Sequence, residues 1–122
     1  MHIDVKSEQP LFLQVARAIE DDILKRSFEE EEQVMSTTEI SVRFQINPAT
    51  AAKGVNLLVQ EGILYKKRGV GMFVSPGARE KVLEKRREEF SQGFFRKMLQ
   101  EAKKLGISKQ ELVKMIEGSD GQ

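Results

Sequence analysis

The chain has 122 residues, with 20 Lys and Arg, 19 Asp and Glu, and no cysteine, which permits one domain with a modest core plus an appendage and excludes disulfides and thiol chemistry. Its single histidine is His2, and it has no metal-spaced cluster or Gly-rich phosphate loop, so we expect neither an enzyme nor a cofactor. Because it lacks both a signal-like apolar run at its start and the roughly 20 apolar residues that span a bilayer, we expect a cytoplasmic protein without membrane contact.

The first predicted helix covers residues 10–25, where apolar residues recur at four-residue steps and form one buried stripe. These residues are Leu11, Val15, Ile19 and Ile23. The loop that follows contains four consecutive glutamates, Glu29 to Glu32. A run of like charge is typical of a solvated loop.

The second predicted helix begins with a capping box, in which Ser36 and Glu39 bond reciprocally to each other's backbone N–H groups. It runs through about Phe44, and Gln45 and Ile46 then turn the chain toward the next helix. The two helices follow each other so closely that a helix-turn-helix arrangement is expected.

The third predicted helix has Asn47 as its N-cap and Pro48 in its first position. Its apolar stripe consists of Ala51, Ala52, Val55, Leu58 and Val59, and its opposite face of Ala49, Thr50, Lys53 and Asn56. Such a small, polar and singly charged face suits the major groove of DNA, although an ordinary solvated surface is the alternative. Gly54 inside this helix is expected to cost about 1 kcal/mol relative to alanine.

A short β-hairpin is predicted after the third helix, which ends at Glu61-Gly62. Residues 63–66 and 71–74 flank a turn at residues 67–70, and the cations Lys66, Lys67 and Arg68 gather there beside Gly69. Cations and glycine at a hairpin tip suit contact with a phosphate or a minor groove. Protection of the hairpin edge against aggregation is the alternative explanation for these cations.

The capped helices and the cationic hairpin together indicate a winged helix-turn-helix domain that binds double-stranded DNA. The N-terminus of the second helix would donate to phosphates, and the third helix would lie in the major groove. The expected DNA contacts are Ser36, Thr37, Thr38, Asn47, Ala49, Thr50, Lys53, Lys66, Lys67, Arg68 and Gly69.

The residues from 10 to 74 resemble the winged helix-turn-helix domain of the GntR family of bacterial transcription regulators. The matching motifs are PLFLQV at residues 10–15, Ser36 with Glu39-Ile40, LLVQEGIL at residues 57–64 and RGVGMFV at residues 68–74. The start of the third helix, residues 47–50, is similar to the short YtrA-like branch, and this resemblance implies DNA contact at Thr50, Lys53, Arg68 and Gly69. Most members carry arginine where this chain has Thr38, and a Gly/Pro-rich loop where it has residues 28–32.

The segment Ser75-Pro76-Gly77 ends the hairpin, and a long helical stretch is predicted over residues 78–105. Gly106 suits a left-handed helix end, and Ser108 with Glu111 forms a second capping box for a last helix. The predicted architecture is therefore mainly α with a small β-hairpin. A winged helix-turn-helix DNA-binding domain at residues 1–76 would be followed by a helical dimerisation module at residues 77–122, folded as a two-helix hairpin.

The two C-terminal helices carry more apolar surface than they can bury against each other. We expect a homodimer in which the same helices of two chains pack together, with the interface formed by Phe90, Phe94, Phe95, Met98, Leu99, Leu112, Met115 and Ile116. The alternative is that these side chains fold back onto the winged domain. A two-fold dimer predicts a palindromic operator.

The sequence favours a dimeric transcription regulator, and a repressor that occludes a promoter more than an activator. A small-molecule effector of unknown identity is an additional option. The alternative function is a protein-interaction adaptor with little DNA affinity that keeps the winged fold and binds a partner through residues 90–105. Threonine at position 38 in place of arginine and the acidic loop favour it, and residues 1–76 contain nine Lys and Arg against eleven Asp and Glu. The acidic loop either orients the domain on DNA by repulsion or is only solvated.

Overall fold

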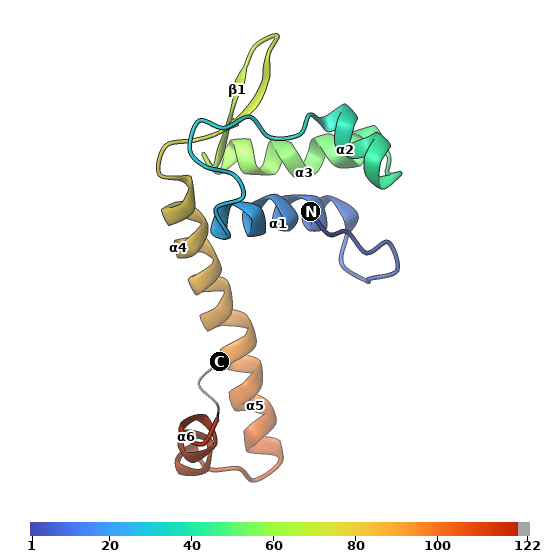
Figure 1. Cartoon of the computed structure of the whole chain (residues 1–122). Helices are drawn as coiled ribbons and strands as arrows, with labels where there is room; N and C mark the ends of the chain where they lie inside the picture. The colour runs from blue at the N-terminus through green and yellow to red at the C-terminus, as the bar shows by residue number, and fades with distance from the viewer. Residues whose placement is uncertain (120–122) are drawn as a thin grey trace. The chain divides into compact units, whose positions relative to one another are not determined.

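A computed structural model describes residues 1–119, which form two compact units, residues 1–84 and residues from 85 onward. The fold is mainly helical with one antiparallel hairpin, which confirms the expected fold class (Figure 1). The elements are α1 (Leu11–Leu24), α2 (Thr37–Phe44), α3 (Pro48–Gln60), β1 (Leu64–Lys67), β2 (Gly71–Val74), α4 (Ala78–Phe90), the π-helical η1 (Ser91–Phe95), α5 (Arg96–Lys104) and α6 (Lys109–Glu117).

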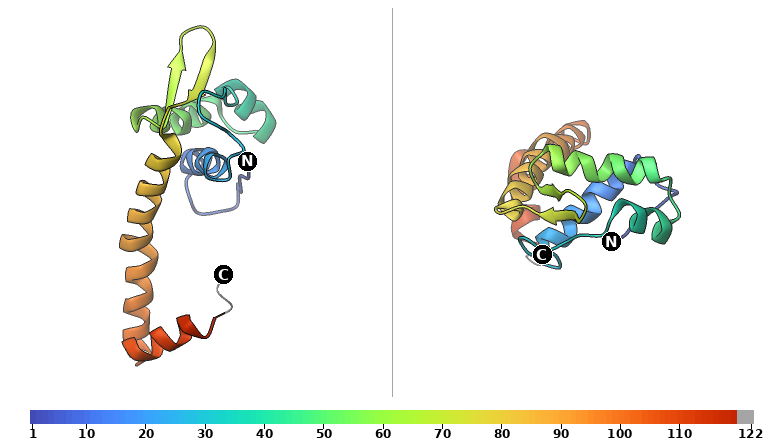
Figure 2. Two further views of the ribbon diagram at one scale, coloured as in Figure 1. Left: turned by 60° about the vertical axis from the view of Figure 1, so that its left-hand side comes forward. Right: turned by 90° about the horizontal axis from the view of Figure 1, so that it is seen from above.

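The first unit packs α1, α2 and α3 around one apolar core, from which the β1–β2 hairpin projects (Figures 1 and 2). The predicted stripe of the first helix supplies much of this core, because Val15, Ile19 and Ile23 are almost completely buried. The other elements contribute Ile40, Ala51, Val55, Leu58, Ile63, Leu64, Val74, Ala78 and Val82. Since Ala78 and Val82 belong to α4, the start of that helix is part of the first unit.

The close approach of α1 and α3 depends on Gly54 in the middle of α3. A Cβ atom at this position would lie 2.6 Å from the Phe12 carbonyl oxygen and 2.8 Å from the Val15 Cβ. Real Cβ atoms do not come so close to other atoms, so only glycine lets the two helices meet at this distance. The glycine that reduces helix propensity is therefore required by tertiary packing.

Gly62 ends α3 with a left-handed turn at φ +74°. The Gly62 N–H donates to the Val59 carbonyl at 3.0 Å, and the Ile63 N–H donates to the Leu58 carbonyl at 2.9 Å. This pair of bonds is the Schellman motif, which satisfies the last carbonyls of the helix. It turns the chain directly into β1 and buries Ile63 in the core.

The hairpin is longer at its tip than expected, because Lys67 pairs with Gly71 and only residues 68–70 form the loop. The chain before α2 adds a further extended segment beside β2. There the Val34 N–H donates to the Met72 carbonyl and the Glu31 N–H to the Val74 carbonyl, at 2.9 and 2.8 Å. The backbone of the acidic segment is therefore bonded to the hairpin edge, while the side chains of Glu29 to Glu32 are exposed to solvent.

The second unit contains the end of α4, η1, α5 and α6. The predicted long helical stretch is present, but η1 interrupts its α-helical hydrogen bonding with one π-helical segment, which the sequence pattern did not indicate. The turn and the last helix expected after it are also present. Gly106 is left-handed at φ +70° and ends α5, while Ser108 and Glu111 form the capping box of α6 with bonds of 3.0 and 3.1 Å.

We expect Gly54→Ala to destabilise the protein by about 1–3 kcal/mol, because overpacking between α1 and α3 outweighs the helix-propensity gain of about 1 kcal/mol. Urea unfolding followed by circular dichroism measures the change. Gly93→Ala in η1 is the matched control, since a Cβ there would have no neighbour within 4 Å. A Gly54→Ala protein as stable as the parent would contradict this account of the packing.

Candidate nucleic-acid interface

The N-terminus of α2 is fixed by the predicted capping box. The Ser36 Oγ accepts from the Glu39 N–H, and the Glu39 carboxylate accepts from the Ser36 N–H, both at 3.0 Å. The backbone N–H of Ser36, and then its hydroxyl, hold the pKa of the Glu39 carboxyl below its ordinary value, because these bonds favour the charged carboxylate. Thr37 is half-buried and Thr38 is exposed in the first turn, where unpaired N–H groups of the helix are available to a phosphate.

The turn between α2 and α3 is held by Ser41, whose hydroxyl donates to the Ile46 carbonyl at 2.7 Å. Gln45 takes the left-handed conformation at φ 55° that reverses the chain. The Asn47 side-chain oxygen then accepts from the Ala49 N–H at 2.8 Å and caps α3, with Pro48 in the first turn as predicted. These local bonds set the direction in which α3 leaves α2.

The outward face of α3 is a shallow groove beside the start of α1. The side chains of Ala49, Lys53 and Asn56 are exposed, whereas Thr50 and Ala52 are half-buried. Phe12 of α1 borders the groove, whose full lining is Phe12, Ala49, Ala52, Lys53, Asn56, Leu57 and Gln60. Ala52 was assigned to the apolar stripe of α3 from the sequence, but the structure places it at this outer surface.

Lys53 is held at the α1 side of this groove. Its Nζ lies 4.0 Å from the centroid of the Phe12 ring, a cation–π contact. Because the aromatic ring attracts the ammonium group, Lys53 is oriented before any ligand arrives. The sequence pattern identified Lys53 but not Phe12, since nothing in the spacing of α1 marks this residue as different from a core side chain.

The hairpin tip exposes Lys66, Lys67, Arg68 and Gly69, as expected. The Lys67 Nζ lies 4.4 Å from the centroid of the Phe73 ring, which holds this cation against one side of the hairpin. Gly69 is left-handed at φ +77°, and a Cβ there would meet no neighbouring atom. The tip is therefore open to an approaching phosphate backbone.

Gln33 connects the acidic segment to the hairpin loop. Its Nε2 donates to the Val70 carbonyl at 3.0 Å, and a Cβ at Gly71 would lie 2.5 Å from the same nitrogen. A second connection joins the Tyr65 hydroxyl to the Glu31 carboxylate, and this bond raises the pKa of Tyr65. Sequence analysis did not identify Gln33, because no local pattern distinguishes it from a solvated loop residue.

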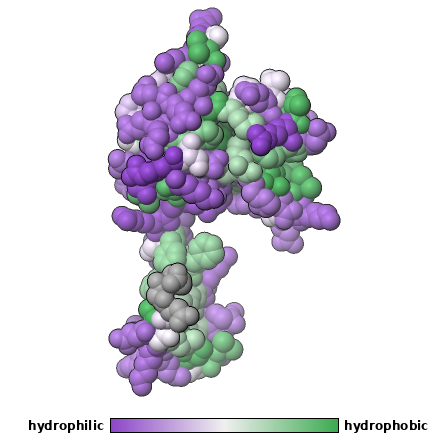
Figure 3. Space-filling model, in the orientation of Figure 1, coloured by the Kyte–Doolittle hydropathy of each residue, from purple (hydrophilic) through white to green (hydrophobic). Residues whose placement is uncertain are grey.

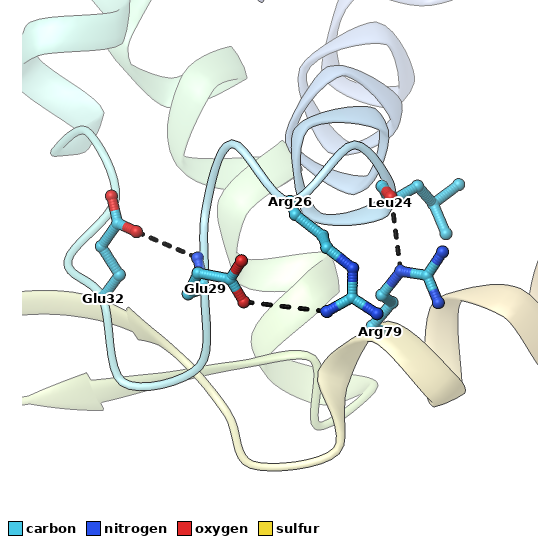
Figure 4. Close-up of polar contacts among 5 residues, drawn as sticks. All are labelled: Leu24, Arg26, Glu29, Glu32 and Arg79. Atoms are coloured by element: carbon cyan, nitrogen blue, oxygen red, sulfur yellow. Dashed lines mark hydrogen bonds and ion pairs between the residues drawn. The ribbon is translucent and has the colours of Figure 1, made fainter.

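The acidic loop itself is folded by short local contacts (Figure 4). The Glu29 N–H donates to the Glu32 carboxylate at 3.0 Å, and the Arg26 guanidinium lies 4.0 Å from the Glu29 carboxylate. Arg79 of α4 reaches the end of α1, where its Nε donates to the Leu24 carbonyl at 3.3 Å. Exposed ion pairs of this kind contribute little to stability, so backbone bonding to β2 determines the position of the loop.

The structure thus gathers all the predicted DNA contacts in the first unit, at the start of α2, along α3 and at the hairpin tip. The predicted interface residues from Phe90 to Ile116 lie in the second unit. Within the described residues 1–119, no helix combines the length and apolar character needed to cross a membrane.

Comparison with known proteins is consistent with this geometry. Residues 11–74 match the model of the gntR family of bacterial regulatory proteins. The chain is 26% identical over 113 residues to the uncharacterized HTH-type transcriptional regulator YhcF of Bacillus subtilis, covering 91% of this chain and 90% of YhcF. It is 27% identical over 84 residues to the HTH-type transcriptional repressor YtrA of Bacillus subtilis, covering 69% of this chain and 65% of YtrA.

The fold is also similar to that of a solved GntR-family structure from Bacteroides thetaiotaomicron. The TM-score is 0.72 at 35% identity, and the match covers 85% of this chain and 90% of that one. These relatives are transcription regulators and not enzymes. The family match spans the helices and hairpin described above, and the chain belongs to the GntR family of bacterial transcription regulators, with a winged helix-turn-helix DNA-binding domain.

Proposed function

We propose that the protein is a homodimeric repressor that binds a palindromic operator and blocks transcription by occluding a promoter. The observation that supports this most is the common placement of the α2 N-terminus, the outward face of α3 and the cationic hairpin tip in one compact unit. These are the parts that a winged helix-turn-helix protein needs to contact phosphates and base edges together.

In the proposed complex, α3 lies in the major groove with its outward face toward the bases. The first turn of α2 donates to a phosphate, where Ser36 orders the free N–H groups and Thr37 and Thr38 add hydroxyls. Arg68 and Gly69 at the hairpin tip contact the backbone or enter the minor groove. Lys53, held by Phe12, contacts a phosphate or a base at the groove edge.

Dimerisation would be a role of the second unit, whose large apolar side chains are strongly exposed. Phe90, Phe94 and Phe95 are 59%, 71% and 44% exposed, and Figure 3 shows green, apolar surface on this unit. Met98, Met115 and Ile116 are also exposed, while Leu99 and Leu112 are half-buried. An apolar surface of this kind is typical of a protein–protein interface.

The exposed rings also argue for a second copy of the same chain as the partner. Phe90 and Phe94 already form a tilted pair with centroids 6.4 Å apart, so a preformed aromatic patch is available. A two-fold axis would bring two such patches together and would present two winged units to successive half-sites. In this proposal, the DNA-binding domain ends at residue 76 and the dimerisation module begins at residue 77.

The repressor role is supported by similarity to YtrA, which is named as a transcriptional repressor. The physical mechanism would be steric, because a dimer that covers two half-sites excludes polymerase from the same DNA. Selection from a pool of random duplexes with the purified protein tests the proposal. A palindrome with half-sites about one helical turn apart, or a multiple of that, is the expected product.

Arg68→Ala is expected to weaken binding to every duplex by a similar factor, because a phosphate contact carries no sequence information. The plot of log affinity against log salt concentration should become less steep. Its slope should decrease in magnitude by about one for each phosphate contact that is lost. Fluorescence anisotropy with the selected duplex at several salt concentrations measures both quantities.

Lys25→Ala is the matched control for Arg68→Ala, since it removes one exposed positive charge from the end of α1, outside the proposed surface. It should leave the affinity and the salt slope close to those of the parent. If Arg68→Ala and Lys25→Ala bind all duplexes equally well, the hairpin does not contact DNA.

Phe94→Asp is expected to convert the dimer to monomers, because it places a charge in the centre of the proposed aromatic interface. Loss of a large buried aromatic side chain costs about 3–5 kcal/mol, which raises the dimer dissociation constant more than 100-fold. Light scattering at micromolar concentration measures the mass, and operator affinity should fall with it.

Gln92→Asp introduces the same charge at an exposed polar position of η1 and should leave the protein dimeric. Persistence of the dimer in Phe94→Asp would place the interface elsewhere. A parent protein that is monomeric in the same experiment would show that the aromatic surface is covered by a different partner.

A further inference from the structure

The outward face of α3 carries one charged residue, Lys53, among small and amide side chains. Between Pro48 and Gln60 the only charged residue is Lys53, and the helix contains no arginine. This face presents the exposed methyl group of Ala49, the half-buried methyl group of Ala52 and the exposed amide of Asn56, with Lys53 exposed beside them. The first three follow at i, i+3 and i+7, which places them along one line of the helix.

The single lysine, four residues after Ala49 and three before Asn56, turns its ammonium group toward α1. Its Nζ lies 4.0 Å from the Phe12 ring centroid, on the side where α1 packs against α3. The close packing at Gly54 brings Phe12 to this position. The cation that would otherwise compete for guanine is therefore attracted toward α1, away from the line of Ala49, Ala52 and Asn56.

Each group on this line has a defined complement in the major groove. An alanine methyl contacts the 5-methyl group of thymine, and an asparagine amide bonds to N6 and N7 of adenine. Guanine is read mainly by arginine or lysine; α3 has no arginine, and its one lysine is held against the Phe12 ring. We infer that the protein selects A·T base pairs at the centre of each half-site, with Ala49 and Ala52 in contact with thymine methyl groups and Asn56 paired with adenine.

This inference rests on the proposed function, since it requires that α3 lies in the major groove. It also distinguishes direct reading from recognition of DNA shape. An A·T-rich site can be preferred for its narrow minor groove or its deformability, without any contact to the bases. Replacing thymine by 2′-deoxyuridine removes only the methyl group in the major groove, so it separates the two explanations.

The experiment begins with selection of duplexes by the full-length protein from a random pool. Each thymine of the selected half-site is then replaced by deoxyuridine, and affinities are measured by fluorescence anisotropy. We expect a loss of about fourfold at each thymine whose methyl group is contacted, as for exposure of one buried methyl-sized group. Thymines outside the half-site centre are the internal control and should tolerate the replacement.

Two variants assign the contacts to residues. In Ala52→Gly the deoxyuridine penalty should disappear at one thymine and persist at the others, and any loss of helix stability affects both duplexes equally and cancels in the double-mutant cycle. Asn56→Ala should reduce the preference for adenine at one position by roughly 5- to 150-fold. Gln60→Ala, one turn further along the same groove, is the control variant and should leave that preference unchanged.

The outcomes separate this inference from the proposed function. A·T-centred half-sites with a deoxyuridine penalty that depends on Ala52 support it. Half-sites centred on G·C pairs, or A·T-centred half-sites that bind equally well with deoxyuridine, overturn it while the repressor proposal stands. Failure to enrich any duplex overturns both.

Discussion

The packing of α1 against α3 at Gly54 is the constraint on which the proposed DNA-binding surface depends. Since a Cβ at this position would collide with the Phe12 carbonyl and with Val15, the two helices meet at a distance that only glycine permits. That contact fixes the rotation of α3 about its axis. Ala51, Val55 and Leu58 then lie in the core, and the line from Ala49 to Asn56 faces outward. The same contact brings the Phe12 ring under Lys53.

The acidic segment shows how a local charge pattern can have a structural role. Four consecutive glutamates next to a DNA-binding domain would be unfavourable if they were free to move toward the phosphates. Here the backbone from Glu31 to Val34 is bonded to β2, and Gln33 reaches the Val70 carbonyl in the hairpin loop. The segment thus braces the hairpin that carries Arg68. Local placement of charge, and not the net charge of the domain, determines what the binding surface presents to DNA.

The two units differ in where their apolar side chains lie. The first unit buries its apolar residues in its own core and presents polar and small side chains outward, whereas the second leaves several phenylalanines and methionines exposed. Exposed rings carry a solvation cost that burial against a partner would relieve, which supports the proposed role of the second unit in dimerisation. In a dimer, each weak set of phosphate and base contacts would be used twice on one DNA molecule.

The sequence by itself determined the elements whose signals are local. The capping boxes at Ser36 and Ser108, the Asn47 cap and the glycine helix ends at Gly62 and Gly106 join residues only a few positions apart, so each could be predicted and is confirmed. The resemblance to the GntR family followed from the same segments and is confirmed by the family match.

Other features were decided only by the tertiary structure. These are the requirement for glycine at position 54, the outward position of Ala52, the cation–π contact between Phe12 and Lys53, and the hydrogen bond from Gln33 to the hairpin loop. Each of these joins residues far apart in the chain or depends on how a helix is rotated. Composition and periodicity do not reveal long-range contacts or the rotation of a helix, because close packing depends on the shapes of side chains and the distances between packed helices.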